Sequence, residues 1–193
     1  MSRRLRTSDL LFAGLVAAGA CAPPRRVEPP RPQTEMEILR AKKLMVPVDG
    51  VSPKDVPDSW NAKRSGERIH RAIDIAAKKG TPVVSTDDGT IFKVRDNKSG
   101  GLTLYVTEPT GRFIYYYAHL DRYREGLREG DRVRKGEVIA YVGTTGNAPT
   151  NHPHLHFQLL RLEDARRWWA GASIDARPLF SAEGKAVKAR PAS

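Results

Sequence analysis

The chain has 193 residues, a length that suits one globular domain with terminal extensions. Its charged fraction of 28% and hydrophobic fraction of 39% are ordinary, but its net charge is +11. A charge of that sign favours polyanionic surroundings, such as nucleic acid, anionic lipid or an anionic cell-wall polymer. The sequence has no helix-turn-helix pattern, zinc finger or RNA-binding aromatic strand, so we expect no nucleic-acid partner.

The N-terminus has the features of a bacterial secretion signal. A basic start precedes an apolar run at residues 10–20, which is too short to span a bilayer and suits a signal peptide at residues 1–20. The small residues before Cys21 suit either acylation of that cysteine or ordinary signal cleavage. We favour a membrane anchor on Cys21, because it is the sole cysteine of the chain. The next residue, Ala22, resembles the pattern of lipoproteins that are sorted to the outer membrane.

The remaining sequence divides into three parts. Residues 21–44 are expected to form a proline-rich tether that ends in a short helix between Glu35 and Leu44. A folded domain is expected over residues 45–180. The tail at residues 181–193 is small and basic, and we expect it to be disordered.

From Ile69 onwards the sequence has the composition and turn spacing of β-strands. The predicted strands are 72–76, 82–86, 90–95, 102–107, 112–118, 132–135, 138–142 and 155–160. The turns between most of them leave no room for crossover helices, which favours an antiparallel sheet. We therefore predict a mainly β fold, a compact antiparallel β-sheet folded on itself, with a groove between loops. One short C-terminal helix is expected at residues 163–170, ended by Gly171.

The segment from His154 to Leu160 carries the clearest chemical signal. As a strand, it places His154, His156 and Gln158 on one face, while the other face is apolar. Two imidazoles then point in one direction from a firmly packed support. That arrangement suits a metal or proton-transfer site, although a pair of histidines alone is a weak metal signal.

Two further segments supply residues of the same kind. His70 and Asp74 are four residues apart, so they fall on one side of a helix or strand, and Ile73 and Ile75 flank the aspartate on the other side. In the run that ends at His119, alternation predicts that Tyr115, Tyr117 and His119 face one way. Taken singly, a structural ion pair or an exposed pair explains His70 and Asp74 better than a metal site does, and a solvated histidine at the end of a strand is the better explanation of His119.

Together these residues have the composition of a catalytic metal site. His70, Asp74 and one of His154 or His156 make a set of three zinc ligands, which leaves a position for water. Zinc lowers the pKa of such a water to about 7. The remaining two histidines suit a proton acceptor and a group that stabilises a developing oxyanion.

The segments that carry these residues resemble the zinc metallopeptidases of the M23 family, the lysostaphin and LytM type that cleave peptidoglycan cross-bridges. The matching segments are 68–77, 80–83, 117–120, 130–136, 142–146 and 153–157. The resemblance implies that His70, Asp74 and His156 are the ligands of Zn²⁺. It also implies that His154 is the general base and that His119 stabilises the tetrahedral intermediate.

A few residues depart from the family pattern or have no role in it. Ala72 and Gln158 stand where glycine and glutamate are common in the family. His152 is expected to lie in a loop at the rim of the groove. We expect Trp168 and Trp169 to pack locally beneath the last strand rather than to form a platform for carbohydrate.

The resemblance implies a zinc-dependent endopeptidase that hydrolyses peptide cross-links of bacterial peptidoglycan, with stem peptides as its substrate. A second hypothesis is a non-catalytic envelope factor of the LytM type that binds and activates a cell-wall amidase, with the divisome as a further partner. All five expected side chains are present, which favours the enzyme. The expected location is the bacterial cell envelope, as a secreted periplasmic lipoprotein of the outer membrane.

Overall fold

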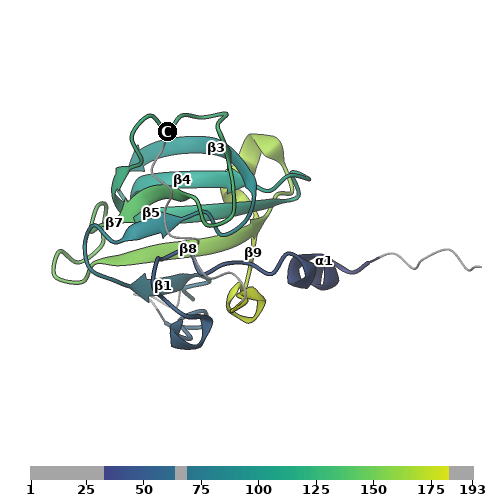
Figure 1. Cartoon of the computed structure of the whole chain (residues 1–193), viewed down its shortest axis with the longest axis horizontal. Coiled ribbons are helices and arrows are strands. Elements are labelled where there is room, and N and C mark those ends of the chain that lie inside the picture. The colour runs from purple at the N-terminus through teal and green to yellow at the C-terminus, as the bar shows by residue number, and fades with distance from the viewer. Residues whose placement is uncertain (1–32, 64–68, 183–193) are drawn as a thin grey trace, which may run out of the picture. The chain divides into compact units, whose positions relative to one another are not determined.

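The computed structural model describes residues 33–63 and 69–182 (Figure 1). The predicted signal peptide, Cys21, the tether up to residue 32 and the tail beyond residue 182 lie outside the described residues. None of the helices within the described part has the length and apolar character that crossing a bilayer requires.

The described residues contain one α-helix, three short 3₁₀-helices and nine strands. The helices are α1 (Glu35–Ala41), η1 (Pro53–Asp55), η2 (Ala165–Ala170) and η3 (Arg177–Leu179). The strands are β1 (Ile73–Ala76), β2 (Pro82–Val84), β3 (Gly89–Asn97), β4 (Gly101–Thr107), β5 (Phe113–Tyr123), β6 (Arg132–Val133), β7 (Val138–Val142), β8 (His154–Arg161) and β9 (Ala172–Ile174). All predicted strands are present. Strand β9 was not predicted, and the expected C-terminal helix is the 3₁₀-helix η2, which is kinked at Arg167.

The strands form a single sheet in which every pairing is antiparallel, which confirms the predicted fold class. Its main order is β1-β8-β5-β4-β3-β6. Figure 1 shows β8 and β5 at the centre, with β1 on one side and β4 and β3 on the other. The long strand β5 pairs with β8 and β4 along its first half and with β7 along its second half, so the sheet branches there.

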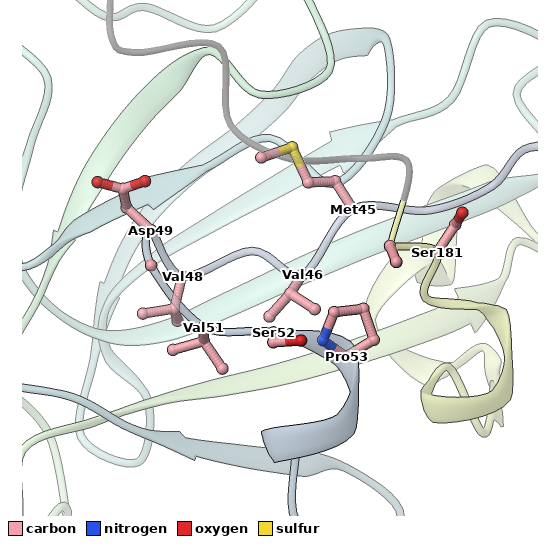
Figure 2. Close-up of a pocket in the computed structure, with 10 residues that line it drawn as sticks. Met45, Val46, Val48, Asp49, Val51, Ser52, Pro53 and Ser181 are labelled. Carbon is pink, nitrogen blue, oxygen red and sulfur yellow. The ribbon is translucent and has the colours of Figure 1, made fainter.

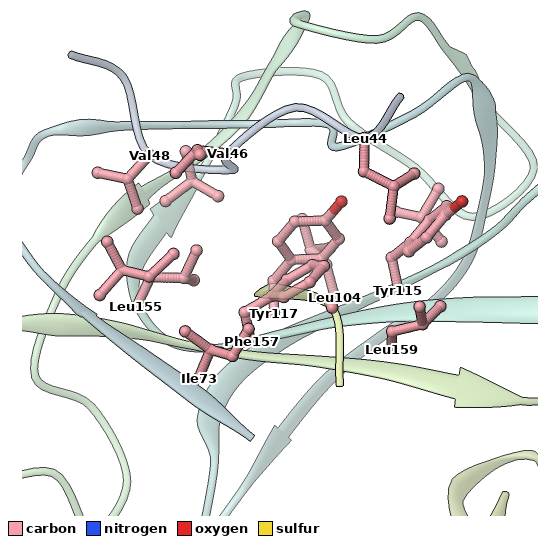
Figure 3. Packing of buried hydrophobic residues seen from close by; sticks show 14 of the residues in the cluster. Leu44, Val46, Val48, Ile73, Leu104, Tyr115, Tyr117, Leu155, Phe157 and Leu159 are labelled. Carbon is pink, nitrogen blue, oxygen red and sulfur yellow. The ribbon is translucent and has the colours of Figure 1, made fainter. Parts of the chain in front are cut away.

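The larger of two buried apolar clusters among the described residues lies on one face of this sheet. Leu155, Phe157 and Leu159 of β8 are fully buried, as the alternation predicted, and they lie beside Tyr115 and Tyr117 of β5 (Figure 3). Burying such side chains contributes about 1.5 to 3 kcal/mol for each aliphatic or phenyl group. The apolar side chains of β8 and β5 therefore fix which face of the sheet turns inward.

The N-terminal segment (residues 44–48) covers this core from the side opposite the sheet. Leu44, Val46 and Val48 point toward the strands (Figure 3), and Leu44 is fully buried. Backbone hydrogen bonds tie the segment down, from the Met45 N–H to the Thr86 carbonyl at 2.9 Å and from the Ser181 N–H to the Leu44 carbonyl at 2.8 Å. Helix α1 joins the same core through Leu39, which is fully buried although it precedes the predicted domain start at Met45. The domain boundaries themselves stay predictions.

A buried ionic cluster anchors the end of α1. The Lys42 ammonium lies 3.0 Å from the Glu108 carboxylate and 3.2 Å from that of Asp87. The Glu108 side chain is fully buried and accepts hydrogen bonds from the Thr110 hydroxyl and the Arg112 N–H. Burial alone would raise the pKa of Glu108, but the hydrogen bonds from Thr110 and the ammonium of Lys42 outweigh it and hold the pKa at about 2.

Glu108→Gln is therefore expected to destabilise the fold in a pH-dependent way. Removal of the charge leaves the Lys42 ammonium with one carboxylate partner fewer, and it should lower the free energy of unfolding by about 1 to 3 kcal/mol at pH 7. Because the folded-state pKa is about 2, below the ordinary 4.5, this stabilisation is present above pH 4.5 and is lost as the pH falls toward 2. Urea unfolding of the metal-free protein at several pH values should show the two proteins converge at low pH. Glu125→Gln, at an exposed loop position, is the control and should show no such pH-dependent difference.

Candidate metal centre

The pairing of β1 with β8 brings the first two candidate ligands together. Asp74 lies directly opposite His156 in this antiparallel pair, and the His156 Nδ1 atom is 2.9 Å from Asp74 Oδ1. Ile73 and Ile75 are both buried on the opposite face, as predicted. The aspartate is thus held toward the histidine face by the burial of its two neighbours.

His70 reaches the same point from the turn before β1. Its Nε2 atom lies 3.1 Å from Asp74 Oδ1 and 3.2 Å from His156 Nδ1. Its Nδ1 atom lies 3.0 Å from the Ser59 carbonyl, which can only accept a hydrogen bond. The neutral ring therefore carries its proton on Nδ1 and presents an unprotonated Nε2 to the cluster.

The segment around Ser59 fixes this turn. The Ser59 hydroxyl accepts a hydrogen bond from the Asp74 N–H at 3.0 Å, and the His70 N–H donates to the Ala62 carbonyl at 2.9 Å. Between the two ligands, Arg71 adopts a left-handed backbone with φ of 52°. The Gln158 side-chain amide donates to the Arg71 carbonyl at 3.1 Å and so ties the turn to β8. Neither contact was predicted, because no sequence pattern pairs Ser59 or Gln158 with this turn.

The three donor atoms have the chemistry that a zinc ion requires, and their spacing is close to that of a zinc site. His70, Asp74 and His156 offer two imidazole nitrogens and one carboxylate oxygen, and together they form a group that could hold a metal ion. Ligand atoms bound at about 2.0 to 2.2 Å in a tetrahedral site lie about 3.3 to 3.6 Å apart. The observed separations of 2.9, 3.1 and 3.2 Å need only a slight expansion to match this geometry.

The electrostatics of the cluster keep the carboxylate ionised. Burial by itself would raise the pKa of Asp74, but hydrogen bonds with His156 and His70 hold that pKa well below its usual range. A divalent metal ion binds aspartate in its ionised form, and the two imidazoles keep Asp74 in that form.

His154 lies beside this group without joining it. Its Nε2 atom is 3.9 Å from Asp74 Oδ1, and its Nδ1 atom lies 2.8 Å from the His152 carbonyl. As with His70, the carbonyl fixes the proton on Nδ1 and leaves Nε2 unprotonated in the neutral ring. His152 is itself exposed in the loop before β8.

His119 is on the histidine face, whereas alternation had placed it with Tyr115 and Tyr117. Those two tyrosines are fully buried in the core, but the His119 ring lies 5.0 Å from the His154 ring and 5.7 Å from the His156 ring. The prediction was wrong because β5 contains a bulge at this point. The register against β4 shifts between Leu102 and Leu104, and His119 has φ of 60°.

Two glycine-containing turns hold the bulge. The His119 N–H donates to the Gly100 carbonyl at 2.8 Å, and its Nδ1 atom lies 2.9 Å from the Thr145 carbonyl. A Cβ added to Gly101 would lie 2.4 Å from the backbone nitrogen of Gly146. The two turns can therefore approach each other this closely only because both positions are glycine. Thr145 completes the junction, because its hydroxyl donates to the Leu120 carbonyl at 2.7 Å.

A pocket near the N-terminal segment lies apart from the histidines. It has a volume of about 330 Å³ and is drawn in Figure 2. Its lining residues are Met45, Val46, Val48, Asp49, Gly50, Val51, Ser52, Pro53, Ser181 and Ala182. None of them belongs to the histidine cluster, so the pocket has no part in the chemistry of this site.

The sequence of the chain matches a family model described as Peptidase family M23 over residues 68–168. The chain belongs to peptidase family M23. The matched region contains all five residues of the cluster, and the predicted resemblance is confirmed.

Individual relatives agree with this assignment. The chain is 32% identical over 117 residues to an L-Ala–D-Glu endopeptidase of Bacillus subtilis (strain 168), which covers 57% of this chain and 36% of the relative. It is 41% identical over 92 residues to the DD-carboxypeptidase/endopeptidase Mpg of Neisseria meningitidis serogroup B, which covers 47% of this chain and 20% of the relative. The catalytic domain of lysostaphin from Staphylococcus simulans superposes with a TM-score of 0.50 at 25% identity, covering 73% of this chain and 93% of that domain. The chain thus spans about a third or less of these two curated relatives.

The burial of His119 predicts an unusual titration. Burial disfavours the imidazolium and lowers the pKa of His119 to about 4. Because the unfolded chain takes up this proton near pH 6.5, the free energy of unfolding falls as the pH is lowered from about 6.5 to 4. In NMR spectra of the metal-free protein, we expect the His119 ring resonances to shift with a midpoint near pH 4. Comparison with His119→Gln identifies these resonances, and a midpoint near 6.5 would contradict the prediction.

Proposed function

We propose that this protein is a zinc-dependent endopeptidase that hydrolyses peptide cross-links of bacterial peptidoglycan. The observation that supports this most is the convergence of two further histidines on the three-ligand group. His154 and His119 each have Nδ1 bound to a backbone carbonyl, and each therefore directs an unprotonated Nε2 away from that carbonyl. A purely structural metal site has no need of such groups.

When bound, zinc supplies a Lewis acid that polarises a carbonyl group and makes water more acidic. His70, Asp74 and His156 would hold the ion. His154 is placed to act as the general base, because its neutral Nε2 can take the proton from the attacking water. The same nitrogen can then return that proton to the leaving amine of the substrate.

His119 has a more restricted role. Its Nδ1–H is committed to the Thr145 carbonyl, and its low pKa keeps the ring neutral at pH 7. In this state Nε2 has no proton to donate. Stabilisation of a developing oxyanion by His119 would need a proton on Nε2, whereas the neutral ring with its proton on Nδ1 accepts a hydrogen bond there.

The relatives and the charge of the chain support the proposed substrate class. The relatives described above are named for cleavage of an L-Ala–D-Glu bond and for DD-carboxypeptidase and endopeptidase activity, so the names do not agree on one bond. We propose peptidoglycan stem peptides as the substrate and leave the bond to experiment. The net charge of +11 suits an anionic wall polymer.

The proposed location is the bacterial cell envelope. A relative from Vibrio cholerae serotype O1 that is named as a peptidoglycan DD-endopeptidase supports it, as does the apolar run that precedes Cys21. We propose that Cys21 carries a lipid anchor that holds the protein at the outer membrane, with an amidase or the divisome as a further partner. Mass spectrometry of the mature protein from cells tests the anchor, because acylation adds mass to the N-terminal cysteine.

Zinc binding is the first test. We expect the purified protein to bind about one zinc ion per chain. His156→Ala or Asp74→Asn removes a ligand and should weaken zinc binding by more than about 100-fold, measured by competition with a chromogenic chelator. His152→Ala is the matched control, since only its main-chain carbonyl contacts the cluster, and it should retain zinc. A wild-type protein without affinity for zinc would refute the proposal.

Hydrolysis is the second test. Incubation of the wild type with purified sacculi should release soluble muropeptides, and His154→Ala should lower the rate by about 100-fold or more through loss of the general base. Zinc content separates the roles, because His154→Ala should keep the ion while His156→Ala loses it. His152→Ala should keep both zinc and activity.

The non-catalytic alternative makes the opposite prediction. It requires that the wild type release no muropeptides and that it increase the activity of a purified cell-wall amidase. That result would refute the endopeptidase proposal.

A further inference from the structure

Strand β1, which carries Asp74, lies at an end of the main strand order, and β8 is its one partner among the described strands. On its other side, a serine hydroxyl takes the place of a neighbouring strand. Ser59 Oγ accepts a hydrogen bond from the Asp74 N–H at 3.0 Å and donates a longer one to the Ala72 carbonyl at 3.4 Å. Backbone groups at an open edge of a sheet need such partners. The position of the Asp74 main chain therefore depends on Ser59 as well as on β8.

The main chain of the same serine orients a second candidate ligand. The Ser59 carbonyl lies 3.0 Å from His70 Nδ1 and fixes the proton there, so that Nε2 faces Asp74 and His156. Ser59 thus contacts two of the three candidate ligands, each through a different group. His156 is held separately, by the pairing of β8 with β1 and β5. Loss of a partner that orients a metal ligand lowers metal affinity or activity by about 10- to 100-fold.

The segment around Ser59 is itself fixed on both sides. Val56, three residues earlier, is buried in the core. The next residue, Trp60, accepts a hydrogen bond through its carbonyl from the Arg71 N–H at 3.0 Å, and its ring centroid lies 5.6 Å from the Arg71 guanidinium carbon. A serine held in this way can keep the ligands in place before an ion binds, because binding requires little further ordering of the segment.

We propose that Ser59 is a positioning residue of the metal centre, which holds His70 and Asp74 in the arrangement that binds the ion. The inference rests on the proposed function, since it takes zinc as that ion. Ser59 precedes the residues 68–168 that match the family model. The chain therefore uses a segment outside the matched region to complete the site that this region carries.

Substitution of Ser59 separates the role of its hydroxyl from that of its carbonyl. Ser59→Ala keeps the carbonyl that orients His70 but removes the partner of the Asp74 N–H. We expect this variant to bind zinc about 10-fold more weakly, measured on the purified protein by competition with a chromogenic chelator. Ser59→Thr keeps a hydroxyl and should restore most of the affinity. Ser52→Ala is the matched control, because the Ser52 side chain makes no capping hydrogen bond to η1, and it should bind zinc like the wild type.

A spectroscopic measurement distinguishes a positioning role from a loss of stability. With Co²⁺ in place of zinc, the visible absorption bands report on the geometry of the ligands. We expect the bands of Ser59→Ala to differ from those of the wild type in position or intensity, and those of Ser52→Ala to be unchanged. A loss of stability alone would lower the midpoint of urea unfolding but leave the bands of the folded protein as they are.

Wild-type zinc affinity or a wild-type Co²⁺ spectrum in Ser59→Ala would overturn the inference, and so would a loss of affinity that Ser59→Thr does not restore. If the wild type releases muropeptides and Ser59→Ala binds zinc equally well, the proposed function stands and this inference fails. If zinc affinity depends on Ser59 but the wild type releases no muropeptides, the inference stands and the proposed function fails.

Discussion

The register between β1 and β8 is the constraint on which the site depends. It sets Asp74 opposite His156, and it is fixed by burial, since Ile73, Ile75 and Phe157 must all face the core. A shift of one residue would turn the aspartate into the apolar layer and an isoleucine toward the histidines. The carboxylate would then be buried without its imidazole partners, at a cost of several kcal/mol. The packing of the core and the geometry of the candidate ligands are therefore one requirement.

Two non-glycine residues with left-handed backbone border the site, and both are tied to it by hydrogen bonds. Arg71 lies between the ligands His70 and Asp74, and its carbonyl is held by Gln158. His119 sits in the bulge of β5 and is held by the carbonyls of Gly100 and Thr145. Such conformations cost about 1 to 3 kcal/mol each and persist only where neighbours enforce them. The fold accepts this cost at His119, whose imidazole points toward the cluster, and at Arg71, which follows the ligand His70 directly.

The two faces of the central strands have separate tasks. One face, with Tyr115, Tyr117 and Phe157, packs under the N-terminal segment and supplies stability. The other face carries His156 and Tyr116, and from there the ring contacts continue to Trp168. The same alternation thus provides both a rigid support and a second face that carries the histidines.

Alternation along β8 was enough to predict its strand, its buried face and the shared direction of His154 and His156, because side chains on a regular strand follow a period of two. The antiparallel, mainly β fold followed from the short turns. The face of His119 could not be predicted this way, because the bulge depends on Gly100–Gly101 meeting Thr145–Gly146 across more than 40 residues of sequence. The same holds for the contacts of Ser59 and Gln158 with the His70–Asp74 turn, which no local pattern encodes. The sequence by itself determined which residues are candidates for the chemistry, whereas the tertiary structure decided which atoms meet, since bulges and register are set by packing between distant segments.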